Sequence, residues 1–148
     1  MTGVTAATPF SVRMTVRNYE LDTLGHVNQA VYHSYGEVAR TSLFDASGCQ
    51  FDKLMNMRLG AVLLQSTINY RRELRANDEF DASADVRFGT GKSFHIDTVL
   101  TKVDGTVSAE ITCVLGLMDL DARRLVTDPR ARFADAGADI ALLTGRRA

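Results

Sequence analysis

The sequence predicts an α+β protein in which a curled antiparallel sheet wraps around one long central helix. Two observations support this class: one helix-like segment lies near the N-terminus, and four long strand-like segments follow it, separated by turn sequences. Successive strands joined by short turns form an antiparallel sheet, and a helix that is apolar over most of its circumference has to be covered by other elements. We therefore expect the helix to lie inside the curve of the sheet.

The N-terminal third contains the first strand and the helix. Apolar and polar residues alternate from residue 10 to about residue 20, which predicts a half-buried strand. Helical spacing of apolar residues then runs from Asn28 to about Ala46. Asn28 is the expected N-cap, because its side chain can accept a hydrogen bond from the first turn, and Gly48 is the expected stop.

The rest of the chain is expected to be mostly strand. Four strands are expected, at about residues 60–73, 78–89, 92–103 and 106–119. The breaks between them contain Gly, Asn and Asp, and Asp104–Gly105 between two alternating segments is a strong hairpin signal. The segment MDLDARRLVTD suggests one more turn and a short strand.

The 148 residues are expected to form a single domain. Residues around 50–60 are expected to be a loop. We expect a loose N-terminal segment at residues 1–9, the domain at residues 10–130, and a C-terminal tail at residues 131–148.

The composition argues against several kinds of partner. With 17 Lys and Arg against 18 Asp and Glu, the formal net charge is −1, so bulk charge indicates neither nucleic acid nor membrane binding. No apolar segment approaches the roughly 20 residues of a membrane-spanning helix, and no signal-peptide pattern is visible, so we expect a cytoplasmic protein. Cys49 and Cys113 match no disulfide framework or metal motif. We expect no metal and no cofactor.

The stretch DTLGHVNQ, between the first strand and the helix, concentrates polar residues. Asp22 can act as a general base or nucleophile, or it can cap the turn that follows it. Asn28 can cap the helix or bind a substrate, and His26 can move protons or serve the fold. Gly25 permits a tight turn and a close approach of a ligand to the backbone. Residue types alone leave these alternatives open.

Three motifs resemble the hotdog-fold acyl-CoA thioesterases of the 4-hydroxybenzoyl-CoA thioesterase type. They are DTLGHVNQAVY, which contains Asp22, Gly25 and Tyr32, then GEVAR, and then INYRRELRANDEFDASADVRFGTGKSFHIDTVL. The resemblance covers about residues 10–127. The first motif is also similar to the Asp-x-Asn-x-His-x-Asn string of plant acyl-carrier-protein thioesterases, with Leu24 in place of the middle asparagine.

The resemblance implies a hotdog fold and hydrolysis of an acyl thioester of coenzyme A or acyl-carrier protein to the free acid and the thiol. It implies Asp22 as general base or nucleophile, and the first helix amides, around residues 28–30, as an oxyanion hole. The expected catalytic residues are Asp22, Gly25, His26, Asn28 and Gln29. The expected substrate- and coenzyme-binding residues are Tyr32, Arg87, Lys92 and Ser93. A second set of cations for the phosphates is Arg71, Arg72 and Arg75.

Other functions and sites stay open. A hydratase or dehydratase of the same fold would pair an Asp with a His, and a non-catalytic acyl-binding module would keep only the pocket. Some family members place the catalytic carboxylate further along the helix, where Glu37 is the candidate, although an ion pair between Glu37 and Arg40 is the simpler interpretation. The resemblance also implies a homodimer or homotetramer whose sheets join edge to edge and whose site is shared between subunits.

Overall fold

The computed structural model describes residues 9–145, so the expected loose segment lies outside the described residues except for Pro9. The strands are β1 (Phe10–Thr15), β2 (Leu59–Tyr70), β3 (Glu79–Phe88), β4 (Ser93–Lys102), β5 (Val107–Asp119) and β6 (Arg124–Leu125). The helices are α1 (Val31–Ala46), α2 (Phe51–Asn56), α3 (Pro129–Asp135) and α4 (Ile140–Leu143), with one 3-10 turn, η1 (Asn18–Glu20). Within the described range no helix has the length and apolar composition needed to cross a membrane.

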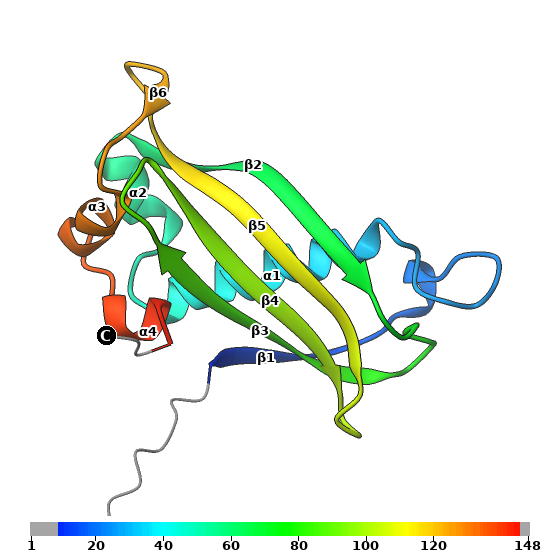
Figure 1. The fold of residues 1–148 in the computed structure, drawn as a ribbon. Coiled ribbons are helices and arrows are strands. Elements are labelled where there is room, and N and C mark those ends of the chain that lie inside the picture. Colours follow the sequence, from blue (N-terminus) through cyan, green and yellow to red (C-terminus); the bar gives the residue numbers. More distant parts are fainter. Residues whose placement is uncertain (1–8, 146–148) are drawn as a thin grey trace, which may run out of the picture.

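The six strands form one antiparallel sheet in the order β1-β3-β4-β5-β2, with β6 paired to β5. The sheet curls around α1, which runs along its concave face (Figure 1). The buried side of α1 packs into this curve through Tyr32, Tyr35, Ala39 and Leu43. The predicted α+β class and the hotdog arrangement are therefore confirmed.

Two predicted strands end too late: β1 ends at Thr15 instead of about residue 20, where η1 follows it, and β2 ends at Tyr70 instead of residue 73. The other strand bounds agree with the structure to within one residue. The hairpin between β4 and β5 closes where the Thr106 N–H donates to Asp104 Oδ1 (2.8 Å). Gly48 ends α1 as expected, because its φ of 87° lies in the left-handed region. The Cys49 N–H then donates a hydrogen bond to the Phe44 carbonyl (3.0 Å). Local turn chemistry thus fixes most of the boundaries.

The prediction that α1 begins at Asn28 is wrong, because α1 begins at Val31. The Asn28 carbonyl accepts from the Val31 N–H (2.9 Å), and its Oδ1 accepts from the Ala30 N–H (2.9 Å). Asn28 therefore closes a turn ahead of the helix instead of capping the helix itself. The segment around residues 50–60, expected to be a loop, contains the short helix α2. Only Leu54 of this helix is buried, so its sequence shows no helical spacing of apolar residues.

The tail expected at residues 131–148 is folded in its described part. Phe133 is fully buried, its ring stacks on Phe44 (5.2 Å between centroids), and it meets Phe94 edge to face (5.4 Å). Leu143 of α4 is also fully buried. This segment therefore contributes Phe133 and Leu143 to the core, and each helix is too short to show an amphipathic period.

Replacing Phe133 by alanine tests this correction. Loss of a fully buried ring is expected to lower the free energy of unfolding by about 3–5 kcal/mol, measured by urea unfolding. Arg130→Ala, at an exposed position of the same helix, is the matched control and should change it by less than about 0.5 kcal/mol. Equal stabilities of Phe133→Ala and the wild type would contradict a role of this segment in the core.

Candidate active site

Asp22 begins the tight turn that precedes α1. Its Oδ1 accepts hydrogen bonds from the Leu24 N–H (2.9 Å) and the His26 N–H (3.2 Å). Gly25 has a φ of 80°, a left-handed conformation that glycine adopts without a steric penalty. The carboxylate is exposed, and its Oδ2 has no partner in the described part of the chain. Asp22 is thus a turn cap through one oxygen and is open to a ligand through the other.

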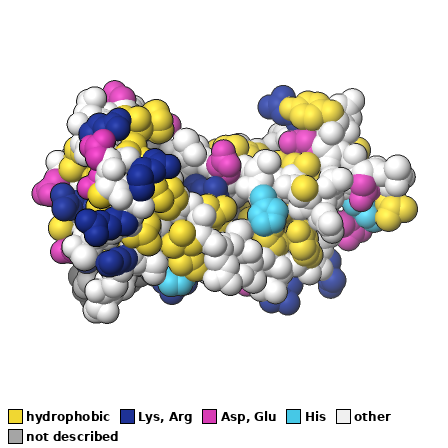
Figure 2. Space-filling view, turned by 90° about the horizontal axis from the view of Figure 1, so that it is seen from above, with side chains coloured by type: hydrophobic (Ala, Val, Ile, Leu, Met, Phe, Trp, Pro, Cys, Tyr) yellow, Lys and Arg dark blue, Asp and Glu magenta, His cyan; other side chains and the backbone are white. Residues whose placement is uncertain are grey.

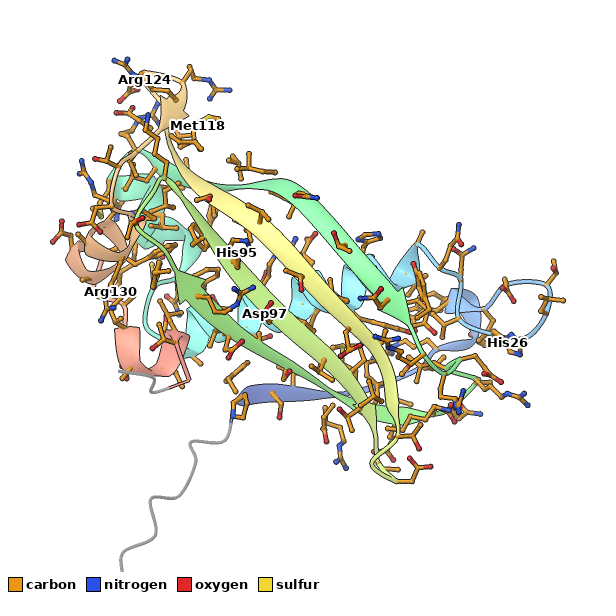
Figure 3. The ribbon with its side chains drawn as sticks, in the orientation of Figure 1. His26, His95, Asp97, Met118, Arg124 and Arg130 are labelled. Carbon is orange, nitrogen blue, oxygen red and sulfur yellow. The ribbon has the colours of Figure 1, made fainter. Side chains whose placement is uncertain are left out.

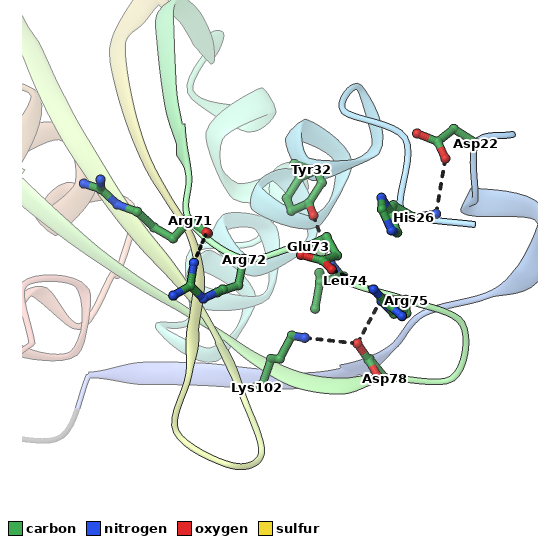
Figure 4. Close-up of polar contacts among 10 residues, drawn as sticks. All are labelled: Asp22, His26, Tyr32, Arg71, Arg72, Glu73, Leu74, Arg75, Asp78 and Lys102. Atoms are coloured by element: carbon green, nitrogen blue, oxygen red, sulfur yellow. Dashed lines mark hydrogen bonds and ion pairs between the residues drawn. The ribbon is translucent and has the colours of Figure 1, made fainter. Parts of the chain in front are cut away.

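This turn is attached to the segment that follows β2. The Val27 N–H donates to the Leu74 carbonyl (2.9 Å), and His26 forms an isolated antiparallel bridge with Arg75. These backbone contacts place the loop that carries Asp22 beside the end of an edge strand about fifty residues later in the chain. Figure 4 shows the two segments facing one another.

A cleft of about 410 Å³ lies between these segments. Seven of the predicted site residues line it: Asp22, His26, Asn28, Gln29, Tyr32, Arg71 and Arg72. The lining residues from the end of β2 and just beyond are Tyr70, Arg71, Arg72 and Glu73, and Val27 completes the wall. Sequence reasoning missed Tyr70 and Glu73, because nothing local indicates which loop the end of a strand will meet.

The turn ahead of α1 leaves one amide unused. The Asn28 N–H donates to the Glu20 carbonyl (2.9 Å), and the Ala30 N–H donates to Asn28 Oδ1. The Gln29 N–H has no hydrogen-bond partner among residues 9–145. Of the three amides expected to form an oxyanion hole, only that of Gln29 is therefore free to bind a ligand.

Tyr32 and Tyr70 form the aromatic wall of the cleft. Their rings meet edge to face with centroids 5.1 Å apart. The Tyr32 hydroxyl accepts from the Leu74 N–H (3.3 Å), and the Tyr70 hydroxyl donates to the Gln29 carbonyl (3.2 Å). Tyr32 is buried, so it serves both the core and the cleft.

Glu20 fastens the loop to α1. Its Oε1 accepts from the Tyr35 hydroxyl (2.8 Å), and its carbonyl accepts from the Asn28 N–H. Burial, followed by the hydrogen bond to the Glu20 carboxylate, raises the pKa of Tyr35 well above its usual value. The phenol therefore stays protonated and remains a donor to Glu20.

Glu73 places a second carboxylate in the cleft. Hydrogen bonds from its own backbone N–H and from the Arg75 guanidinium (2.9 Å) lower its pKa. Glu73 is thus a fixed negative charge at neutral pH, and among residues 9–145 Asp22 is the cleft carboxylate that has no ion pair.

The predicted coenzyme-binding set lies elsewhere in the chain. The β3–β4 hairpin carries Arg87, Lys92 and Ser93, whereas the cleft adjoins the opposite ends of these two strands. A strand of ten residues is about 30 Å long, and this length separates the hairpin from the cleft. Arg87 Nε and Nη2 both donate to the Asp97 carboxylate on the neighbouring strand β4. Within one chain, the hairpin residues do not join the site.

Glu37, the alternative carboxylate, is also separate from the cleft. Its side chain is 71% exposed, and its Oε2 lies 3.8 Å from Arg40 Nη2, which is the ion pair that the spacing predicts. Glu37 lines a second cleft of about 400 Å³ between α1, α2 and β2. The structure thus separates the two candidate carboxylates.

The three histidines lie apart. His26 is on the loop beside the cleft, and His95 is on β4 next to Asp97 in the sheet (Figure 3). His33 Nδ1 is 3.2 Å from Ser66 Oγ, between α1 and β2. No group of three or more His, Cys, Asp or Glu side chains among residues 9–145 is arranged to hold a metal ion.

A family model and several known proteins are similar to this chain. The model of the thioesterase-like superfamily matches residues 16–137, which include every residue that lines the cleft. Long-chain acyl-CoA thioesterase FadM of Escherichia coli is 28% identical over 113 residues, which cover 76% of this chain and 85% of FadM.

Acyl-acyl carrier protein thioesterase ATL3 of Arabidopsis thaliana is 27% identical over 92 residues, 62% of this chain, and this match spans 48% of ATL3. Among solved structures, the Staphylococcus aureus protein SAV2348 in complex with CoA superimposes with a TM-score of 0.82 at 20% identity, over 97% of this chain and 90% of that one. The last comparison shows that the fold is shared.

Tyr35→Phe tests the attachment of the loop. Removing the hydroxyl leaves the Glu20 carboxylate without its buried donor, and we expect the free energy of unfolding to fall by about 1.5–3 kcal/mol in urea unfolding. Tyr70→Phe removes an exposed hydroxyl and is the control, with an expected change below about 1 kcal/mol. Similar losses in the two variants would show that the Glu20 contact does not anchor the loop.

Proposed function

Because this chain belongs to the thioesterase-like superfamily, we propose that it hydrolyses an acyl thioester of coenzyme A or acyl-carrier protein to the free acid and the thiol. The observation that carries the proposal is the position of Asp22. Two backbone N–H groups hold one oxygen of its carboxylate, and the other oxygen is open to a cleft lined by an aromatic wall and by the turn ahead of α1.

In this mechanism Asp22 Oδ2 takes a proton from a water molecule that attacks the thioester carbon. Alternatively, Oδ2 attacks the carbon directly, and water hydrolyses the resulting anhydride. In either case the C–S bond breaks, the thiolate is protonated, and the acyl group leaves as the acid. The Gln29 N–H is the donor available to the carbonyl oxygen as it gains negative charge.

His26 has a supporting part in this scheme. Its backbone N–H fixes the Asp22 carboxylate, and within residues 9–145 no hydrogen bond joins its ring to that carboxylate. A hydratase or dehydratase would need an Asp and a His side chain acting as a pair, so the contact through the backbone favours hydrolysis. His26, Asn28 and Gly25 thus act mainly by shaping the turn.

A second copy of the chain completes the proposed enzyme. The edges of the sheet are β1, with 6 residues, and β2, with 12. Leu63 and Leu64, near the middle of β2, are 48% and 52% exposed. Seen from above, the molecule exposes hydrophobic side chains along its middle (Figure 2). A long unpaired edge with exposed leucines favours self-pairing, so we propose a homodimer joined through β2.

Asp22→Asn tests the catalytic proposal. Asparagine keeps the oxygen that accepts from Leu24 and His26 but removes the base, so kcat for thiol release should fall by about 10²–10⁴, with little change in stability. Thiol release is measured with short, long and aromatic acyl-CoAs and with acyl-carrier protein. Glu37→Gln is the matched control and should retain activity, because Glu37 lies outside the cleft.

A loss of activity in Glu37→Gln together with an active Asp22→Asn would move the chemistry to the second cleft. No release from any substrate by the wild type would favour a non-catalytic acyl-binding module.

Leu64→Lys tests the dimer. A charge at the centre of β2 should convert the dimer into a monomer in light-scattering chromatography and reduce activity by about tenfold or more, since the proposed site is shared between copies. Ser11→Lys introduces the same charge on β1, the other edge, and should leave the dimer intact. A dimeric Leu64→Lys protein would exclude β2 as the pairing edge.

A further inference from the structure

In the part of the chain that the structure describes, one cation of the cleft, Arg72, has no carboxylate partner. Figure 4 draws Arg71 and Arg72, which line the cleft, together with Arg75 and Lys102. Three of them have a carboxylate partner: Arg71 with Glu110 at 2.8 Å, Arg75 with Glu73 at 2.9 Å, and Lys102 with Asp78 at 3.4 Å. Within residues 9–145 the Arg72 side chain makes one contact, from Nη1 to the Arg71 carbonyl at 3.4 Å. Its charge is therefore available to a ligand.

The backbone of Arg72 is held firmly, although its side chain is exposed. The Arg72 N–H donates to the Ser108 carbonyl (3.0 Å), and the Ser108 hydroxyl donates to the Arg72 carbonyl (2.7 Å). Ser108 is fully buried in β5. A guanidinium whose backbone is held in place loses less conformational entropy when it binds an anion than one on a mobile loop.

Arg72 and Asp22 lie at different ends of the cluster. In Figure 4, Asp22 is on the loop ahead of α1, Arg72 is beyond the end of β2, and Tyr32 and Glu73 are drawn between them. In a thioester of coenzyme A or of a carrier protein, the pantetheine arm separates the reacting carbon from the nearest phosphate. An anchor for that phosphate has to lie away from the catalytic carboxylate, as Arg72 does.

We propose that Arg72 binds a phosphate of the leaving group and so anchors the phosphopantetheine arm in the cleft. The proposal rests on the hydrolysis proposed above. The planar guanidinium matches a phosphate in shape and charge, and it can donate two parallel hydrogen bonds. The diphosphate of coenzyme A and the phosphodiester of a carrier protein present the same chemistry to Arg72.

The test compares substrates with and without a phosphate. One acyl group is presented as its coenzyme A, carrier-protein and N-acetylcysteamine thioesters, the last of which has no phosphate. For Arg72→Ala, kcat/KM on a phosphate-bearing substrate should fall about ten- to hundredfold through KM, while the N-acetylcysteamine thioester is unaffected. Arg72→Lys should retain part of the activity. Arg13→Ala removes an arginine of β1 that is paired with Asp81, outside the cleft; it is the matched control and should change little.

The pattern of losses identifies the source of the phosphate. A loss confined to the coenzyme A thioester supports the diphosphate, and a loss confined to the carrier substrate supports the phosphodiester. Equal losses on all three substrates, or no loss on any, would overturn the proposal.

Calorimetry with free coenzyme A and with the carrier protein in its phosphopantetheine form measures the same contact without turnover. If Arg72→Ala bound coenzyme A and the carrier protein as tightly as the wild type does, the Arg72 proposal would fail, whether or not the protein is active. If the wild type bound these ligands but hydrolysed no thioester, only the proposed function would be refuted.

Discussion

The candidate site depends on one backbone contact, the hydrogen bond from the Val27 N–H to the Leu74 carbonyl (2.9 Å). Residues 21–28 form no long strand or helix of their own, so their position has to be set by contacts with other segments. This bond and the neighbouring bridge from His26 to Arg75 tie the loop to the segment after β2. Both contacts use the main chain, and the side-chain contact from Tyr35 to Glu20 adds a second attachment of the loop to α1.

The two ends of the wrapped helix have different surroundings. At the C-terminal end of α1, Phe44, Phe94 and Phe133 form an aromatic cluster with α3, beside the second cleft. At the N-terminal end, the turn ahead of α1 faces the end of β2 across a cleft. A helix offers unpaired amides to a ligand only at its N-terminal end, and the cleft beside the Gln29 N–H lies at that end of α1.

Structural and chemical roles coexist in single residues of this site. A carboxylate has two oxygens, so Asp22 can cap its turn through Oδ1 while Oδ2 faces the solvent. Tyr32 combines a buried ring with a position on the cleft wall. The question of whether these polar residues serve the fold or the reaction therefore has no exclusive answer, because holding the turn in shape is what positions the free oxygen.

The sequence by itself determined the order of the strands and the bounds of β3, β4 and β5. It also determined the Asp104–Gly105 hairpin, the Gly48 stop of α1 and the stretch from Asp22 to Gln29 in which the site begins. These features are local: side-chain alternation, turn-forming residues and short motifs act within a few neighbouring positions. The start of α1 was misplaced by three residues, because a turn closed by the side chain and carbonyl of Asn28 resembles a helix cap in sequence.

Only the tertiary structure decided which distant residues meet the loop. It brought Tyr70, Arg72 and Glu73 to Asp22, and it left Arg87 and Lys92 at the far end of the sheet. The physical reason is that strand order and register are set by the packing of all strands around α1 together, and these long-range contacts leave no periodic signal in any one segment.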